Sequence, residues 1–202
     1  MLKHLTKLTK HRKWYKNRKL LHIKSNTLSK KSESISTKFI LIIDASNIAA
    51  KHKISWLALF MQVMGERRIY GGAIAGNTIT LPTHLRSLFT HRNMTFYSEE
   101  TKYDNRTNCE KYVDDFLHKE ARTFIPKEGS ITGKTMIFVT GDGNNNHGKD
   151  TFPRVIHDAV KHGFLVEIWS WSNNRSKNLT KLGKIYKDKV KINNLTSMVI
   201  RK

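Results

Sequence analysis

Several residue types are scarce in this chain of 202 residues, and each scarcity excludes a class of protein. The single cysteine, Cys109, rules out an intrachain disulfide framework and favours a reducing compartment. The apolar runs 39–43 and 56–61 are far shorter than the roughly 20 residues that span a bilayer. Ten scattered histidines and a lone thiol argue against a zinc site. We therefore expect an intracellular protein that does not cross a membrane.

Acidic residues are also scarce. The chain has 37 Lys and Arg against 16 Asp and Glu, which gives a net charge of +21. A surplus of this size and sign attracts polyanions, so we expect RNA or another nucleic acid as the partner. An acidic protein or an anionic membrane surface is the alternative. The length suits one domain with a substantial core.

The first 37 residues form a basic segment with eleven Lys and Arg and one acidic residue. Such a segment buries too little apolar surface to fold alone, so we interpret 1–37 as a flexible arm. It is a nucleic-acid-binding extension, an address for the nucleus or the mitochondrion, or a solvated tail. The first interpretation predicts RNA contacts at Arg12, Lys13, Trp14, Arg18 and Lys19.

From Lys38 onward, apolar segments of strand length alternate with amphipathic ones. We expect strands at 38–46, 68–76, 94–100, 135–142 and 164–171, the last closing the sheet, and helices at 54–64, 81–92, 107–124 and 152–163. In helix 54–64 the apolar face is expected at Ile54, Leu57, Phe60 and Met64. This alternation predicts an α/β fold with a mainly parallel central sheet and helices on both faces. The domain is expected to span 38–182, followed by a basic extension at 183–202. The basic segment from Asn173 onward is expected to form one helix and a final short strand at 196–200.

Acidic residues follow two of the predicted strands. Asp44 ends the first, and Asp142 follows the apolar run 136–140. The carboxyl ends of parallel strands form the functional crevice of such sheets, so the two meet if their strands are neighbours. Asp114 or Asp115 from helix 107–124 supplies a third carboxylate, and the helical periodicity does not choose between them. Structural alternatives are a helix cap at Asp44 and a turn at Asp142.

Clustered carboxylates repel one another unless a cation lies between them. Oxygen ligands suit Mg²⁺ or Mn²⁺, and such ions activate water for attack on phosphorus. Near the same strand ends, Lys149, Arg175 and Lys177 are predicted phosphate contacts, or else solvated charges.

The stretch 139–151, VTGDGNNNHGKDT, also approximates a phosphate-binding P-loop. The pattern fails at its last position, where Asp150 replaces the hydroxyl that binds magnesium. Asp142 adds a second negative charge beside the phosphates. We therefore favour a carboxylate site over a nucleotide site. Trp169 and Trp171 alternate in a predicted strand, where packing in the core is favoured over stacking on bases.

Four segments in order resemble the NYN family of PIN-like ribonuclease domains: LIIDASNIA, CEKYVDDFL, IFVTGDGN and GFLVEIWSWSNNRSKNL, within 38–182. The resemblance implies a PIN-like, Rossmann-like three-layer sandwich whose aspartates bind Mg²⁺ or Mn²⁺. It assigns metal roles to Asp44, Asp114 and Asp142, and it gives Asn47 the task of orienting water or substrate. A further family carboxylate is replaced by Asn144, or compensated by Asp115 or Asp150.

The sequence therefore predicts a divalent-metal-dependent ribonuclease that cuts RNA internally. The alternative is a non-catalytic RNA-binding protein with a nuclease-like fold, such as a component of a ribonucleoprotein particle.

Overall fold

The computed structural model describes residues 38–50, 52–77, 85–86, 94–99, 112–127, 133–143 and 150–200. These residues all belong to one compact unit, 36–202. The predicted RNA contacts at Arg12, Lys13, Trp14, Arg18, Lys19 and Lys149 lie outside the described residues, as do Asn144 and most of the predicted helix 81–92. No helix within the described ranges is long and apolar enough to cross a membrane.

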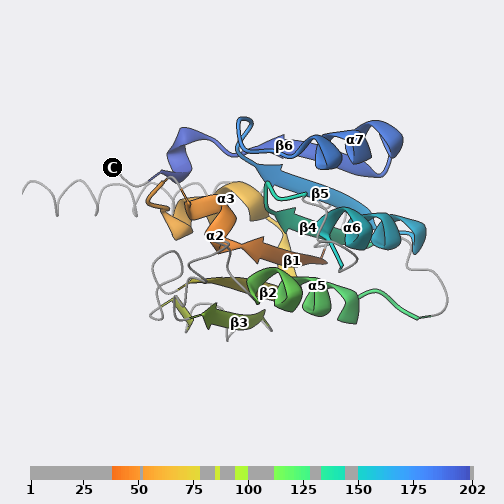
Figure 1. Ribbon diagram of the computed structural model, residues 1–202, viewed down its shortest axis with the longest axis horizontal. Coiled ribbons are helices and arrows are strands. Elements are labelled where there is room, and N and C mark those ends of the chain that lie inside the picture. The colour runs from red at the N-terminus through yellow and green to blue at the C-terminus, as the bar shows by residue number, and fades with distance from the viewer. Residues whose placement is uncertain are drawn as a thin grey trace, which may run out of the picture. The chain divides into compact units, whose positions relative to one another are not determined.

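The described residues build a six-stranded parallel sheet in the order β3-β2-β1-β4-β5-β6 (Figure 1). Its strands are β1 (Lys38–Asp44), β2 (Arg68–Asn77), β3 (Met94–Glu99), β4 (Thr135–Val139), β5 (Leu165–Ser170) and β6 (Val190–Asn194). The helices are α2 (Ala45–Ala49), α3 (Trp56–Met64), α5 (Val113–Thr123), α6 (Phe152–Lys161) and α7 (Lys177–Ile185), with a 3-10 turn η3 (Ser197–Val199).

Helices cover both faces of the sheet, and successive side chains of each strand point alternately to one face and the other. In β1, Phe39, Leu41 and Ile43 join the core beneath α2, α3 and η3, whereas Ile40 and Ile42 join the core beneath α5, α6 and α7. Figure 1 shows α5, α6 and α7 side by side on the second face. The molecule is thus a three-layer α/β sandwich with a parallel sheet, as the sequence predicted.

Helix α6 begins and ends at residues whose types favour helix termini. The Thr151 side chain accepts a hydrogen bond from the Arg154 backbone N–H, and Pro153 lies in the first turn. Gly163, with a φ of 92°, follows the last turn. Helix α5 begins at Val113, and the first part of the predicted helix, 107–111, lies outside the described residues.

The predicted apolar face of helix 54–64 is confirmed at Ile54, Phe60 and Met64, which lie in or against the core, but it is wrong at Leu57. Leu57 is 73% exposed, and the face packed on the sheet consists of Trp56, Leu59, Phe60 and Val63. The helix begins only at Trp56, because Ile54 pairs in an antiparallel bridge with Ile200. Trp56, Leu59 and Val63 thus move the centre of the buried face of α3 away from Leu57.

The predicted end of the domain is also wrong. The proposed boundary at Leu182 falls inside α7, and β6 rather than β5 is the last strand of the sheet. Residues 197–199 form η3 instead of a strand, and Val199 is fully buried. The Lys-rich composition concealed β6 because an edge strand with a solvated side needs few apolar residues. The domain therefore continues to Ile200.

The orientation of α3 on the sheet leads to a prediction about stability. We expect Leu59→Ala to lower the free energy of unfolding by about 2–5 kcal/mol, since it leaves a cavity under the sheet. Leu57→Ala, two residues away on the exposed side, should change it by less than about 0.5 kcal/mol. Urea unfolding of both variants measures this. Equal losses would contradict the observed helix orientation.

Candidate functional site at the carboxyl edge of the sheet

The sheet reverses its strand order between β1 and β4. The chain proceeds from β1 outward to β2 and β3, and α5 then carries it back to β4 on the other side of β1. In open parallel sheets ligands bind beyond the carboxyl ends of the strands at such a switch point. Asp44 ends β1, and 141–143 follow β4, so the two predicted acidic strand ends are neighbours.

The Asp44 carboxylate is held from two directions and is only 3% exposed. Its Oδ1 accepts a hydrogen bond from the Asn47 backbone N–H (3.0 Å), which makes Asp44 the N-cap of α2. Its Oδ2 accepts one from the Thr140 hydroxyl (2.9 Å). Thr140 Oγ1 in turn accepts from the Asp142 backbone N–H (3.1 Å), so this hydroxyl connects both aspartates. Sequence reasoning missed Thr140, although its position directly before Gly-Asp was an available signal.

The Asn47 side chain bridges the same two strand ends. Its Oδ1 accepts a hydrogen bond from the Gly141 backbone N–H (2.8 Å). A side chain at 141 has no room, since a Cβ there would lie 2.7 Å from the Asn174 carbonyl oxygen and 3.0 Å from Asn47 Oδ1. Because the amide oxygen faces Gly141, the Nδ2 group is the donor that Asn47 can direct toward a ligand.

The loop after β5 closes the other side of the site. The Ser176 N–H donates to the Gly141 carbonyl (2.9 Å), and Asn178 Nδ2 donates to the Gly143 carbonyl (2.7 Å). These two bonds bracket Asp142 and attach the start of α7 to its loop. At the end of β2, the Asn77 N–H donates to Ser46 Oγ (3.1 Å). Residues from four elements or loops therefore meet at this edge of the sheet.

Three carboxylates share one electrostatic environment here. The pKa of Asp44 lies well above its ordinary value, first because of burial, then because of the negative charge of Asp114, with a further contribution from Asp142. Hydrogen bonds from Asn47 and Thr140 oppose this rise. The structure thereby distinguishes the two helical acids, since Asp114 acts on Asp44 whereas Asp115 acts on His118.

The donor chemistry of this cluster, carboxylate oxygens only, fits Mg²⁺ or Mn²⁺. However, no three His, Cys, Asp or Glu side chains of the described part are grouped closely enough to hold an ion together. Both oxygens of Asp44 also accept hydrogen bonds from the protein. An ion at this position would therefore need water between it and part of the carboxylate set, a hydrated form that Mg²⁺ commonly keeps.

One buried titratable side chain beside the cluster escaped sequence reasoning. His118 of α5 is 2% exposed and packs edge-on against Phe152, with ring centroids 4.4 Å apart. Its ring nitrogens have no hydrogen-bond partner among the described residues. Burial lowers the pKa of His118, while Asp150, Asp115 and Asp142 act in the opposite direction. Its place four residues after Asp114 was the only hint in the sequence.

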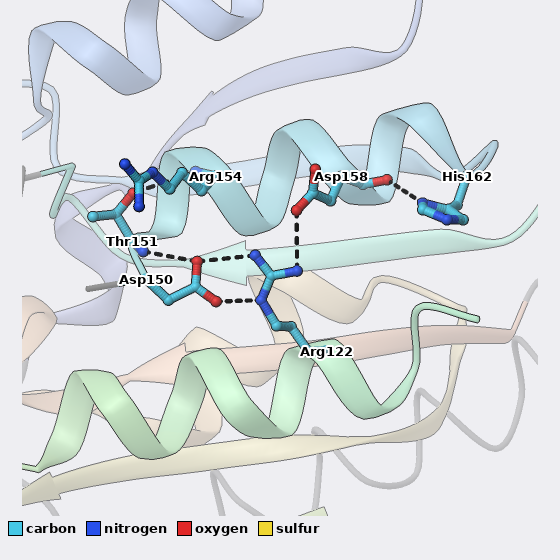
Figure 2. Close-up of polar contacts among 6 residues, drawn as sticks. All are labelled: Arg122, Asp150, Thr151, Arg154, Asp158 and His162. Carbon is cyan, nitrogen blue, oxygen red and sulfur yellow. Dashed lines mark hydrogen bonds and ion pairs between the residues drawn. The ribbon is translucent and has the colours of Figure 1, made fainter. Parts of the chain in front are cut away.

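Asp150 belongs to an ion-pair cluster rather than to the carboxylate site (Figure 2). Arg122 donates through Nε and Nη2 to the two carboxylate oxygens of Asp150, and through Nη1 to Asp158 (3.0 Å). The guanidinium lowers the pKa of Asp150, and the pKa of Arg122 is raised in return. Asp150 therefore does not compensate for a missing site carboxylate, as one interpretation of the sequence held. Instead it ties α5 to the start of α6.

Of the basic residues predicted to contact phosphate near the strand ends, Arg175 and Lys177 lie within the described part of the chain, and they differ in position. Arg175 donates to Ser170 Oγ (2.7 Å), to the Asn193 carbonyl (3.3 Å) and to Asn194 Oδ1, so its guanidinium joins the ends of β5 and β6. We therefore assign it a structural role instead of an RNA contact. Lys177 is exposed at the first position of α7.

Both tryptophans pack in the fold, as the favoured interpretation held. Trp171 is 7% exposed and its Nε1 donates to the Ile48 carbonyl (2.9 Å). Trp169 is partly buried against the same core, and its Nε1 donates to Glu167 (3.0 Å).

No protein-family model and no curated protein matches the sequence. Among solved structures, the chain is similar to a protein of unknown function from Vibrio parahaemolyticus, with a TM-score of 0.53 and 12% identity over 85% of this chain and 100% of that chain. At this identity the similarity supports the α/β fold alone.

The raised pKa of Asp44 predicts a pH-dependent stability. An acid whose pKa is raised by folding stabilises the fold below its ordinary pKa of 3.8, and this contribution disappears as the pH rises through the folded value. At pH 8 in EDTA, Asp44→Asn should therefore raise Tm, by about 2–5 °C per pKa unit removed. Added Mg²⁺ should raise the Tm of the wild type but not that of the variant.

Asp115→Asn is the matched control for this experiment. We expect it to leave both the pH profile and the Mg²⁺ response of Tm unchanged. A lower Tm for Asp44→Asn at pH 8 would contradict the cost of the buried Asp44 charge, and equal Mg²⁺ responses in all three proteins would contradict a cation at Asp44.

Proposed function

We propose that this protein is a divalent-metal-dependent ribonuclease that hydrolyses phosphodiester bonds within RNA. The observation that carries the proposal is the negative field of Asp114 and Asp142 on a buried Asp44 at the switch point of the sheet. Such a field is costly unless a proton or a cation neutralises it. A cation in this position would lie where a ligand enters an open parallel sheet.

Each side chain of the site would have a distinct role in hydrolysis. A divalent ion, when bound, would activate a water for attack on phosphorus and stabilise the departing oxygen. Asp44, Asp114 and Asp142 would hold it, directly or through water. Thr140 keeps the Asp44 carboxylate in one orientation. Asn47, fixed by Gly141, would donate from Nδ2 to a phosphate oxygen or to the attacking water.

RNA is supported as the substrate by charge and by the resemblance of the sequence to the NYN family. The net charge of +21 favours a polyanion. Lys177 lies between Ser176 and Asn178, the two residues that are bonded to the loop carrying Asp142. The same resemblance favours an internal cut over trimming from an end.

A non-catalytic RNA-binding function is the second candidate, and one observation favours it. Both Asp44 oxygens accept hydrogen bonds from the protein itself, and the raised pKa makes a proton an alternative to a cation. In that case Asp44 would act as a buried cap of α2, and the protein would bind RNA within a ribonucleoprotein particle.

Two pairs of aspartates provide the test. With labelled single-stranded RNA and Mg²⁺ or Mn²⁺, Asp114→Asn and Asp142→Asn should each reduce cleavage by roughly 100-fold or more, since even supporting residues of metal sites contribute about 10–100-fold. Asp115→Asn and Asp150→Asn should cleave at close to the wild-type rate. The Tm of each variant confirms that it is folded.

The pattern of these variants separates the two functions. Cleavage that persists in EDTA, or equal losses in all four variants, would contradict the proposed metal site. Tight RNA binding without divalent-dependent cleavage by the wild type would favour the non-catalytic function.

A further inference from the structure

One edge of the sheet carries a dense row of cations. We define the lysine ridge as the six exposed lysines of α7, β6 and the turn between them: Lys177, Lys181, Lys184, Lys187, Lys189 and Lys191. The same span, 177–191, contains a single acid, Asp188. Among the described residues no carboxylate forms an ion pair with any of the six. Figure 1 shows α7 next to β6 at this edge of the sheet.

The helix presents three of these lysines on one face. With about 100° per residue, Lys177, Lys181 and Lys184 fall within roughly 60° of one another. The opposite face of α7 is buried through Leu179 and Leu182, so the lysine face points to solvent. Between Lys177 and Lys184 the helix rises by about 10 Å. The ridge is therefore a row of point charges and not a compact patch.

The ridge begins at the carboxylate site. The residues on either side of Lys177 are bonded to the Asp142 loop, because the Ser176 N–H donates to the Gly141 carbonyl and Asn178 Nδ2 donates to the Gly143 carbonyl. Gly143 allows this close approach, since a Cβ there would lie 2.3 Å from Ser176 Oγ. A nucleic-acid strand bound along α7 would thus reach the carboxyl edge of the sheet at Lys177.

We propose that the lysine ridge binds the phosphate backbone of single-stranded RNA and leads the strand into the site between β1 and β4. This inference rests on the proposed function for the direction of the path, but the binding itself does not require cleavage. Lysine contacts phosphate as a point charge and reads no base, so the ridge binds RNA without sequence preference. A single row of charges matches one backbone.

Edge strands provide a different explanation for some of these lysines. Charged side chains, lysine above all, prevent edge strands from pairing with other chains. Lys189 and Lys191 on the β6 side suit this role. It does not account for Lys177, Lys181 and Lys184, which lie on a helix and continue to the site.

The test uses the full chain with three helical lysines neutralised, K177Q/K181Q/K184Q. The control, K38Q/K127Q/K161Q, removes the same charge from exposed lysines at the start of β1, after α5 and at the end of α6, where the amino edge of the sheet lies. Fluorescence anisotropy with a labelled 20-nucleotide oligouridylate in EDTA, over a series of salt concentrations, gives Kd and its salt dependence. Thermal unfolding confirms that both triple variants are folded.

The expected result is a change in slope that is specific to the ridge. Each lost phosphate contact lowers the slope of log Kd against log salt by about 0.7 for a single strand, so the ridge variant should lose about 2. If the proteins converge at 1 M salt, this corresponds to roughly 100-fold weaker binding at 0.1 M. The control should stay close to the wild type. Equal losses of RNA affinity in both variants would mean that net charge alone explains the binding, which would overturn the proposal.

Two further outcomes separate the ridge from the proposed function. RNA binding that is unchanged in the ridge variant would overturn the ridge, even if the wild type cleaves RNA. Specific loss of binding in a protein that never cleaves would support the ridge and refute the ribonuclease. If the wild type cleaves, the ridge variant should show a raised KM with kcat nearly unchanged, because the ridge does not touch the reacting atoms.

Discussion

The burial of one carboxylate organises this molecule. Asp44 ends the central strand β1 at 3% exposure, with the negative charges of Asp114 and Asp142 acting on it. A buried charge needs hydrogen bonds and a neutralising partner. Asn47 and Thr140 supply the hydrogen bonds. Either a proton or a divalent cation completes the neutralisation. With a proton the site only stabilises α2, whereas with a cation it can also perform chemistry.

The surroundings of Asp44 link the site to the rest of the fold. Thr140 and Asn47 join the ends of β1 and β4, and Ser176 and Asn178 attach α7 to the loop that carries Asp142. The Arg122 cluster connects α5, which carries Asp114, to the start of α6. Consequently a strand bound along α7 and an ion held by the aspartates would act on the same loop.

Much of this arrangement could be predicted from the sequence, because apolar strands followed by an acid are a local pattern. The neighbouring positions of Asp44 and Asp142 and the parallel sheet were predicted correctly. The helical periodicity did not choose between Asp114 and Asp115, since the choice depends on how α5 is rotated against β1 and β2, whereas the resemblance to the NYN family favoured Asp114. Thr140 was missed because its role requires two strand ends to meet. The last strand, β6, was hidden by its lysines, which reflect its place at an edge.

The most direct test of the shared-cation account is anomalous diffraction at the manganese edge from crystals equilibrated with Mn²⁺. We expect a peak between Asp44, Asp114 and Asp142, close enough for each carboxylate to contact the ion directly or through one water. The peak should be absent in Asp44→Asn crystals grown under the same conditions. Saturating Mn²⁺ without a peak at this position, or with a peak only at a remote surface, would contradict the claim that these three aspartates share a cation.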